Sequence, residues 1–198
     1  KDTLHTDPNN TAQIGYQLAS IPSVTSVGMA QLLPGKERQF NNGLILLDGI
    51  STEGIDNRGK ILAKAKLKAL AVQYSDIQGK SQADNRELFK NQVVYLYHNT
   101  IDAIGDKQTT QYKTFNAVDD AIKELAEIIK KIHSTYNVAK VIVTADHGFL
   151  YNDRDLPEQY KETTPNPDAL ITRNRVAVSN KNTLSDMAYH FPLSATPL

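Results

Sequence analysis

The sequence predicts an α/β fold, a mostly parallel sheet with helices on both faces. Apolar residues switch repeatedly between short runs typical of buried strands and the wider spacing typical of amphipathic helices. The run 141–143 is almost unbroken in hydrophobicity, which indicates a strand covered on both faces, as in a parallel sheet. The chain has 198 residues, of which 40% are hydrophobic and 22% charged, so we expect a single domain with a substantial core.

Strands are expected at residues 43–47, 92–97 and 140–144, because each run is rich in Val, Ile, Leu or Tyr and ends in a polar cluster. A shorter strand is expected at 176–179. The strongest helix is 116–136, whose apolar residues recur every three or four positions and whose first turn is acidic and last turn basic. A second helix is predicted at 56–70, with a lysine-rich face that we interpret mainly as solvated surface.

Charge and cysteine content restrict the classes of partner. Lys plus Arg and Asp plus Glu number 22 each, so no overall field attracts nucleic acid or an anionic membrane. The absence of cysteine excludes disulfides and thiolate metal sites and fits a cytoplasmic location. No apolar run approaches the roughly 20 residues of a membrane helix, so no membrane partner is expected. Residues 1–10 are expected to form a flexible tail, and 152–168 a loop or lid.

Asp146 and His147 directly follow the run 140–144 and precede Gly148. In open α/β sheets ligands bind at the carboxyl ends of strands, and carboxylate and imidazole both bind divalent ions well. A turn-forming aspartate beside a surface histidine is an equally frequent reading of these residues alone.

Asp102 and Asp106 form an Asp-x-x-Gly-Asp motif after the expected strand 92–97. A loop at this position would let both carboxylates turn toward one cation. The same letters also describe an ordinary polar loop.

Thr25 follows Pro22 and Ser23 and is expected at the start of a helix of about two turns that Pro34 ends. The free amides and positive dipole end of a helix favour a bound phosphate or a developing alkoxide. A threonine that merely caps a helix has the same local sequence.

These three elements together resemble PglZ proteins, members of the alkaline phosphatase superfamily. Related phosphodiesterases and nucleotide pyrophosphatases have a similar Pro-Ser/Thr-x-Thr segment whose second hydroxyl residue is the nucleophile, which matches Thr25. Their Asp-x-x-Gly-His motif is similar to residues 102–106, and their Asp-His ligand pair is similar to Asp146 and His147. The resemblance covers about residues 20–151 and is most specific at 97–102 and 144–149.

The resemblance implies an alkaline-phosphatase-like fold and two divalent metal ions, Zn, Mn or Mg. Asp102 and Asp106 would serve one ion, and Asp146, His147 and the Thr25 oxygen the other. Asp106 replaces the histidine of the wider superfamily, which favours harder ions at that subsite. Thr25 would attack the phosphorus of a phosphate ester, and the phosphothreonine would then be hydrolysed. The substrate class extends to nucleic acid, and the implied partners are other proteins of bacterial BREX and Pgl phage defence.

Two further ligands of the family have no match in this chain. Neither Asp2 nor Asp7 follows an apolar run, and His190 precedes Phe191 and Pro192 rather than two glycines. We therefore expect residues 1–198 to be one partial domain, truncated at both ends. A catalytically silent interaction module and a nuclease acting on DNA are the alternatives to a general phosphate ester hydrolase.

Two other positions are of interest. Asp48-Gly49 ends the expected strand 43–47 and is interpreted as a turn in preference to a ligand site. His98 is a candidate to support Asp102 from behind.

Overall fold

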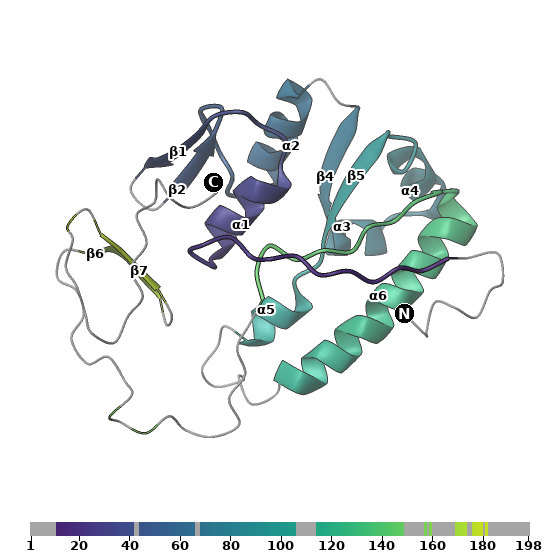
Figure 1. Ribbon diagram of the computed structural model, residues 1–198. Coiled ribbons are helices and arrows are strands. Elements are labelled where there is room, and N and C mark those ends of the chain that lie inside the picture. Colours follow the sequence, from purple (N-terminus) through teal and green to yellow (C-terminus); the bar gives the residue numbers. More distant parts are fainter. Residues whose placement is uncertain are drawn as a thin grey trace. The chain divides into compact units, whose positions relative to one another are not determined.

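The computed structural model describes residues 11–41, 44–65, 68–105, 114–148, 157, 159, 169–173, 176–179 and 181 (Figure 1). The chain divides into two compact units, each made of two separate stretches of sequence. One unit comprises residues 1–17 and 66–143, and the other comprises residues 18–65 and 144–198. Both units contain helices and strands, in agreement with the predicted α/β class.

In the unit of residues 18–65 and 144–198, helix α1 (Thr25–Leu32) packs on a small antiparallel sheet. The strands β1 (Arg38–Asn41), β2 (Leu44–Leu47) and β3 (Ile50–Ser51) lie in the order β1-β2-β3, and helix α2 (Ile55–Lys64) follows. Val27 and Ala30 of α1 form a buried cluster with Ile45 of β2. The hydroxyl of buried Thr52 donates to the carbonyls of Ser26, at 3.4 Å, and Ile45, at 3.3 Å. These contacts fix α1 on the sheet.

Asp48 and Gly49 form the two-residue turn between β2 and β3, which confirms the turn interpretation. Leu47 pairs with Ile50, and the φ angles of Asp48 and Gly49 are 51° and 80°, as the tight turns of hairpins require. The Asp48 carboxylate also accepts the amides of Glu37, at 2.8 Å, and Lys36, at 3.1 Å. These two bonds, the Glu37 bond first, lower the pKa of Asp48 from its ordinary value of 3.8.

In the unit of residues 1–17 and 66–143, strands β4 (Ala69–Gln73) and β5 (Val93–Tyr97) pair in parallel and end level, Gln73 opposite Tyr97. Helix α3 (Tyr74–Gln78) directly follows β4, and α4 (Gln82–Leu88) leads to β5. Helix α5 (Thr100–Gly105) follows β5, and the long helix α6 (Thr114–Tyr136) contacts both α4 and α5 (Figure 1). The parallel pair therefore brings the residues that follow β4 and β5 to one edge.

The predicted helix 116–136 is confirmed as α6. Its buried hydrophobic positions are Ala117, Ala121, Ala126, Ile128, Ile132 and Tyr136, whereas Ile122 is 53% exposed. The small alanines allow close packing in the first half of the helix. The helix ends at Tyr136, and the next residue, Asn137, takes a left-handed conformation with φ 58°.

Three predictions of local structure are wrong. Residues 140–144 form no strand, and Ile142 and Val143 are 73% and 59% exposed, because the segment joins no hydrogen-bonded ladder in the described part of the chain. Helix α2 ends at Lys64, and Ala69 and Leu70 already belong to β4. Asp102 lies in the first turn of helix α5, where a loop was expected. Periodicity does not separate these states over such short runs.

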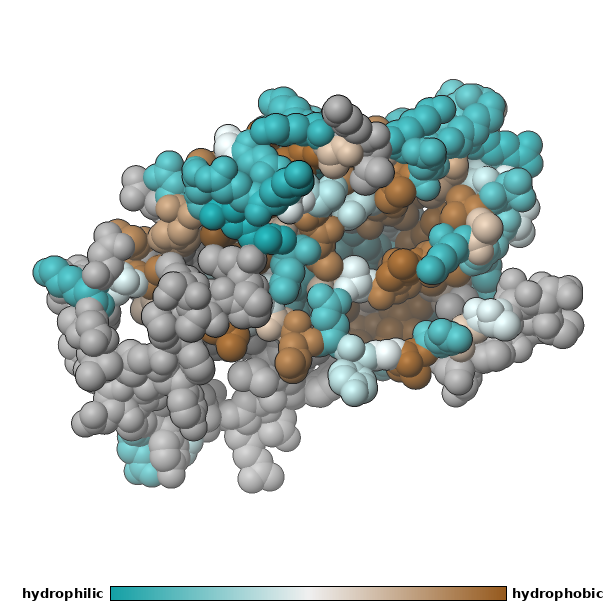
Figure 2. Space-filling model, turned by 45° about the horizontal axis from the view of Figure 1, so that its top comes forward, coloured by the Kyte–Doolittle hydropathy of each residue, from teal (hydrophilic) through white to brown (hydrophobic). Residues whose placement is uncertain are grey.

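The predicted sheet is only partly present among the described residues. Strands at 43–47, 92–97 and 176–179 are confirmed as β2, β5 and β7 (Val176–Ser179). Only β4 and β5 are parallel, whereas β7 pairs antiparallel with β6 (Ala169–Arg173). All residues of β5 retain some exposure, and hydrophobic residues (brown) reach the surface in Figure 2. The expected tail 1–10, Asp106 and His190 lie outside the described residues, as does nearly all of the expected lid.

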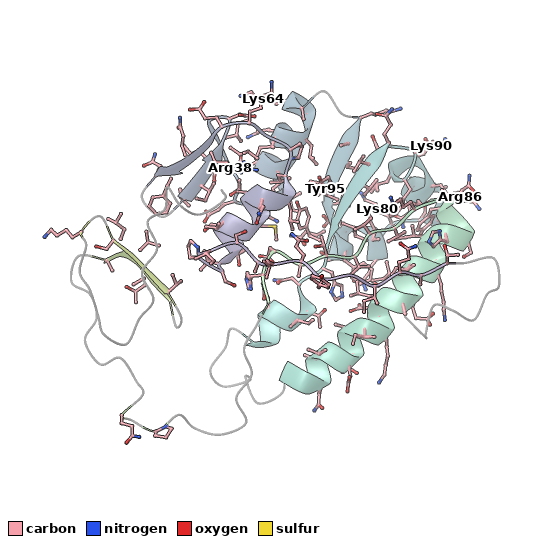
Figure 3. The ribbon with its side chains drawn as sticks, viewed as in Figure 1. Arg38, Lys64, Lys80, Arg86, Lys90 and Tyr95 are labelled. Atoms are coloured by element: carbon pink, nitrogen blue, oxygen red, sulfur yellow. The ribbon has the colours of Figure 1, made fainter. Side chains whose placement is uncertain are left out.

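The lysines that we expected on one face of a helix at 56–70 do not all lie in one helix. The ammonium group of Lys64, labelled in Figure 3, donates to the carbonyl of Asp48 at 2.6 Å, and Lys60 bonds Asn57 at 3.3 Å. Lys68 precedes β4 and is not part of helix α2. These contacts favour a structural and solvated role over nucleic-acid binding. No helix in the described ranges combines the length and apolarity that crossing a membrane requires.

Candidate active site

Thr25 is the first residue of α1, as the sequence predicted, and its side chain is exposed. The preceding residue, Val24, is extended, with φ −134° and ψ 152°, and no side chain caps the helix. The positive end of the helix dipole and its first amides are therefore available near the Thr25 hydroxyl. This environment favours negative charge, either on a bound anion or on the threonine oxygen.

His147 is the partner of Thr25, with Nε2 of the imidazole 3.1 Å from Oγ1 of the threonine. The other ring nitrogen, Nδ1, lies 2.9 Å from the carbonyl oxygen of Gly148. A carbonyl only accepts hydrogen bonds, so Nδ1 carries the proton. In the neutral ring Nε2 then offers its lone pair, and the Thr25 hydroxyl donates to it. In metal-binding histidines, a hydrogen bond from one ring nitrogen likewise fixes the tautomer and turns the other nitrogen toward the ion.

Asp146 places a carboxylate beside the same nitrogen. Among the described residues its Oδ2 atom is buried without a hydrogen-bond partner, and it lies 3.6 Å from Nε2 of His147, beyond hydrogen-bond distance. The side chains of Asp146 and His147 are both only 12% exposed. A buried carboxylate oxygen without a partner is costly unless a cation neutralises it. This donor set, one carboxylate and one oriented imidazole beside a hydroxyl, fits a divalent ion.

Gly28 explains how α1 and the segment around Asp146 approach so closely. A Cβ atom at Gly28 would overlap the backbone carbonyl of Asp146 and lie 2.9 Å from the Asp146 side chain. The glycine is buried inside the helix, where its helix propensity is about 1 kcal/mol worse than that of alanine. Backbone contact at Gly28, one turn after Thr25, therefore sets the distance between Thr25 and His147. The contact was not predicted, although a glycine within a short helix is a signal for close approach.

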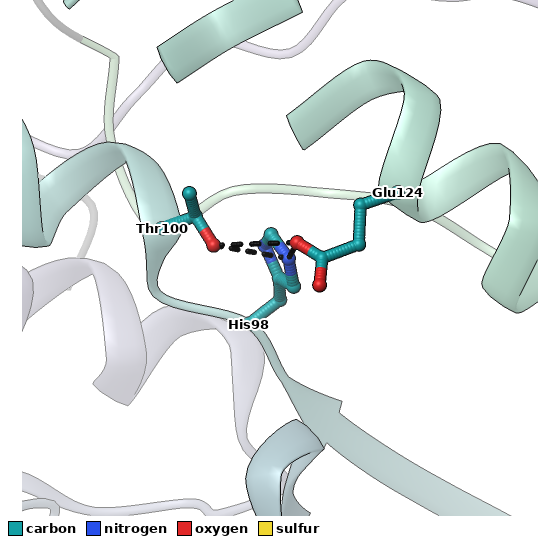
Figure 4. A network of polar contacts seen from close by, with 3 residues as sticks. All are labelled: His98, Thr100 and Glu124. Carbon is teal, nitrogen blue, oxygen red and sulfur yellow. Dashed lines mark hydrogen bonds and ion pairs between the residues drawn. The ribbon is translucent and has the colours of Figure 1, made fainter. Parts of the chain in front are cut away.

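Asp102, another of the predicted acids, belongs to the unit of residues 1–17 and 66–143. Asp102 is half-buried in the first turn of α5, immediately after the carboxyl end of β5. His98 lies between β5 and α5 and bonds Glu124 of α6, with 2.7 Å between Nε2 and Oε2 (Figure 4). Glu124 was not predicted, since its partner is 26 residues away in the sequence. Burial raises the pKa of Tyr95, in the middle of β5.

The chain combines an α/β fold with a threonine at the start of a helix, beside an Asp-His pair. These features define the alkaline phosphatase-like class, which its motifs resemble. The chain belongs to the family described as the BREX system PglZ alkaline phosphatase-like domain, whose sequence profile matches residues 1–196. The resemblance found in the sequence is thereby confirmed.

Two curated relatives are similar over most of the chain. The alkaline phosphatase-like protein BrxZ of Escherichia coli O9:H4 (strain HS) is 38% identical over 164 residues, which is 81% of this chain and 19% of the relative. The alkaline phosphatase-like protein PglZ of Bacillus cereus (strain H3081.97) is 32% identical over 177 residues, 87% of this chain and 20% of the relative. The chain thus spans about a fifth of the length of either relative. No solved structure matches.

Proposed function

We propose that this chain carries the nucleophile and part of the metal site of a divalent-metal-dependent phosphate ester hydrolase. The observation that carries the proposal is the Thr25 hydroxyl, at the amino end of α1 and 3.1 Å from an imidazole nitrogen; beside that nitrogen lies a buried carboxylate oxygen that has no hydrogen-bond partner in the described part of the chain. An exposed hydroxyl in a field that favours its anion is suited to nucleophilic attack.

In this proposal Asp146 and His147 hold one divalent ion, and Asp102 and Asp106 hold a second. Asp102 follows the carboxyl end of a parallel strand, which is the edge at which α/β sheets bind ligands. The ions supply positive charge against the attacking and leaving oxygens. The proposal also concerns the fold: β4 and β5 belong to a larger, mostly parallel sheet with helices on both faces, in one domain.

The first step of the reaction is the transfer of the phosphoryl group to Thr25. The Thr25 hydroxyl gives its proton to water, and its oxygen attacks phosphorus in line; the bond from phosphorus to the ester oxygen of the substrate breaks, and that oxygen takes a proton from water and leaves as the alcohol, so that a phosphothreonine ester remains. The free amides at the start of α1 stabilise the negative charge on the transferring phosphoryl oxygens. Water then hydrolyses the ester and restores the hydroxyl. We propose that this chemistry serves a bacterial defence system in the cytoplasm, together with other proteins of that system, because the family and the names of the relatives indicate that setting.

The experiment compares Thr25→Ala, Thr25→Ser and Ser23→Ala, with p-nitrophenyl phosphate and bis(p-nitrophenyl) phosphate as substrates and Mn²⁺, Zn²⁺ or Mg²⁺ present. Ser23 is the matched control, an exposed hydroxyl two residues from Thr25. We expect Thr25→Ala to lower kcat at least about a thousandfold, Thr25→Ser to retain part of it and Ser23→Ala to change it little.

Two results would contradict the proposal. Unchanged turnover in Thr25→Ala would remove Thr25 as the nucleophile. A wild-type chain that binds the ions but turns over neither ester would favour an interaction module, and cleavage of DNA alone would favour a nuclease.

A further inference from the structure

We propose that Glu124, through His98 and Thr100, is a positioning device that fixes the first turn of α5 and so orients the Asp102 carboxylate. The role of Asp102 as a ligand rests on the proposed function, whereas the mechanical connection from Glu124 to α5 is independent of it. All four residues belong to one unit of the fold.

Glu124 occupies an unusual place for an acid. On α6 it follows Ala121 by three residues and precedes Ile128 by four, so it lies on the stripe that the helix buries. Its side chain is 35% exposed, whereas Glu127, one turn later, is 77% exposed. A carboxylate on the inner side of a helix requires a polar partner. The inner position of Glu124 therefore points to a specific tertiary contact.

Two residues at the amino-terminal end of α5 make this contact (Figure 4). His98 Nε2 lies 2.7 Å from Glu124 Oε2, and the Thr100 hydroxyl donates to the same oxygen at 3.5 Å. An ionised carboxylate only accepts, so the Nε2 proton of His98 points to Glu124. The imidazole is 12% exposed, and its ring lies 5.5 Å from the ring of Tyr74, tilted by 49°. The Oε2 atom of Glu124 thus contacts both residues that flank Asn99, namely His98 and Thr100.

The place of this network links it to Asp102. Tyr74 and His98 are the residues that directly follow β4 and β5, at the carboxyl edge of the parallel pair. Thr100 is the first residue of α5, and the amide of Ala103 bonds the carbonyl of Asn99 at 3.1 Å, which closes the first turn around Asp102. Rotation of this turn moves Asp102, and the bonds to Glu124 oppose that rotation. Removal of a residue that hydrogen-bonds or orients a metal ligand commonly lowers metal affinity 10- to 100-fold.

The test compares Glu124→Ala with Glu124→Gln and with the control Glu127→Ala. Glu127 lies on the same helix, its side chain is 77% exposed, and its carboxylate lies 3.6 Å from the ammonium group of Lys130. The first readout is amide hydrogen exchange of residues 99–105, and the second is Mn²⁺ affinity measured by electron paramagnetic resonance. In Glu124→Ala we expect exchange in this segment to rise about tenfold beyond any change in global unfolding, and Mn²⁺ affinity to fall about tenfold.

The controls separate positioning from general stability. Glu124→Gln keeps an oxygen that accepts the Nε2 proton, so we expect recovery to within about threefold of wild type for both readouts. Glu127→Ala should leave both unchanged. Unaltered exchange in Glu124→Ala would overturn the proposal, as would faster exchange with unchanged Mn²⁺ affinity. If the wild-type chain binds no Mn²⁺, the proposed function fails, while the exchange readout still decides whether Glu124 orders α5.

Discussion

The Thr25 hydroxyl lies 3.1 Å from Nε2 of His147, although 122 residues separate the two in the sequence. Both side chains are brought there by backbone packing between α1 and the segment that carries Asp146. The pair is therefore a property of the tertiary structure, and substitutions at the packing contact should disturb it.

Gly28→Ala tests that packing contact. The added methyl group overlaps the Asp146 backbone, so we expect the free energy of unfolding to fall by about 1–3 kcal/mol, despite the better helix propensity of alanine. Gly59→Ala is the matched control, because Gly59 also lies within a helix but has nothing within 4 Å of its added Cβ. This control should gain roughly 0.5–1 kcal/mol. Urea denaturation of both variants measures the difference, and equal stability of the two would show that α1 does not need the close approach.

Asp146→Asn tests whether the buried carboxylate serves a cation. The metal-free variant should be at least as stable as wild type, because an unpaired buried oxygen loses its negative charge. Mn²⁺ at one hundred times its Kd should stabilise the wild type by about 2.7 kcal/mol and the variant far less. Thermal unfolding with and without Mn²⁺ checks both statements. The same metal-induced increase in Tm in wild type and variant would mean that Asp146 is not a ligand.

Asp48→Asn tests the turn between β2 and β3. The pKa of Asp48 is lowered in the folded state by the amides of Glu37 and Lys36, so its stabilisation is complete above the ordinary value of 3.8. It is lost as the pH falls through the lowered folded pKa. Asparagine also tolerates the left-handed conformation of this position, so the substitution chiefly removes the charge. Unfolding measured from pH 7 down to acid should show the variant less stable at neutral pH, with the difference vanishing in acid. A difference independent of pH would exclude this explanation.

Residues that act through local chemistry were predictable from the sequence. The helix that begins at Thr25, the turn at Asp48-Gly49 and the helix ending near Tyr136 each follow from capping, turn or periodicity rules. The family was recognisable from its motifs because they join residue types in a fixed order, and the profile match confirms it.

Features that depend on partners distant in the sequence were not predictable. The run at 141–143 has the composition of a buried strand, yet a strand exists only where another strand pairs with it. Glu124 is one of several acids on α6, and only the tertiary structure brings it to His98. Ala117 and Ala121, and not the larger Ile122, form the inner face of α6, since close packing of neighbouring helices selects small residues there.

Anomalous diffraction from crystals of the chain grown with Mn²⁺ tests most directly whether Asp146 and His147 hold a divalent ion. We expect an anomalous peak directly coordinated by Asp146 and His147, with the Thr25 oxygen next to it. Manganese bound only at other places in the chain, with none at Asp146 and His147, would show that this pair is not a metal site.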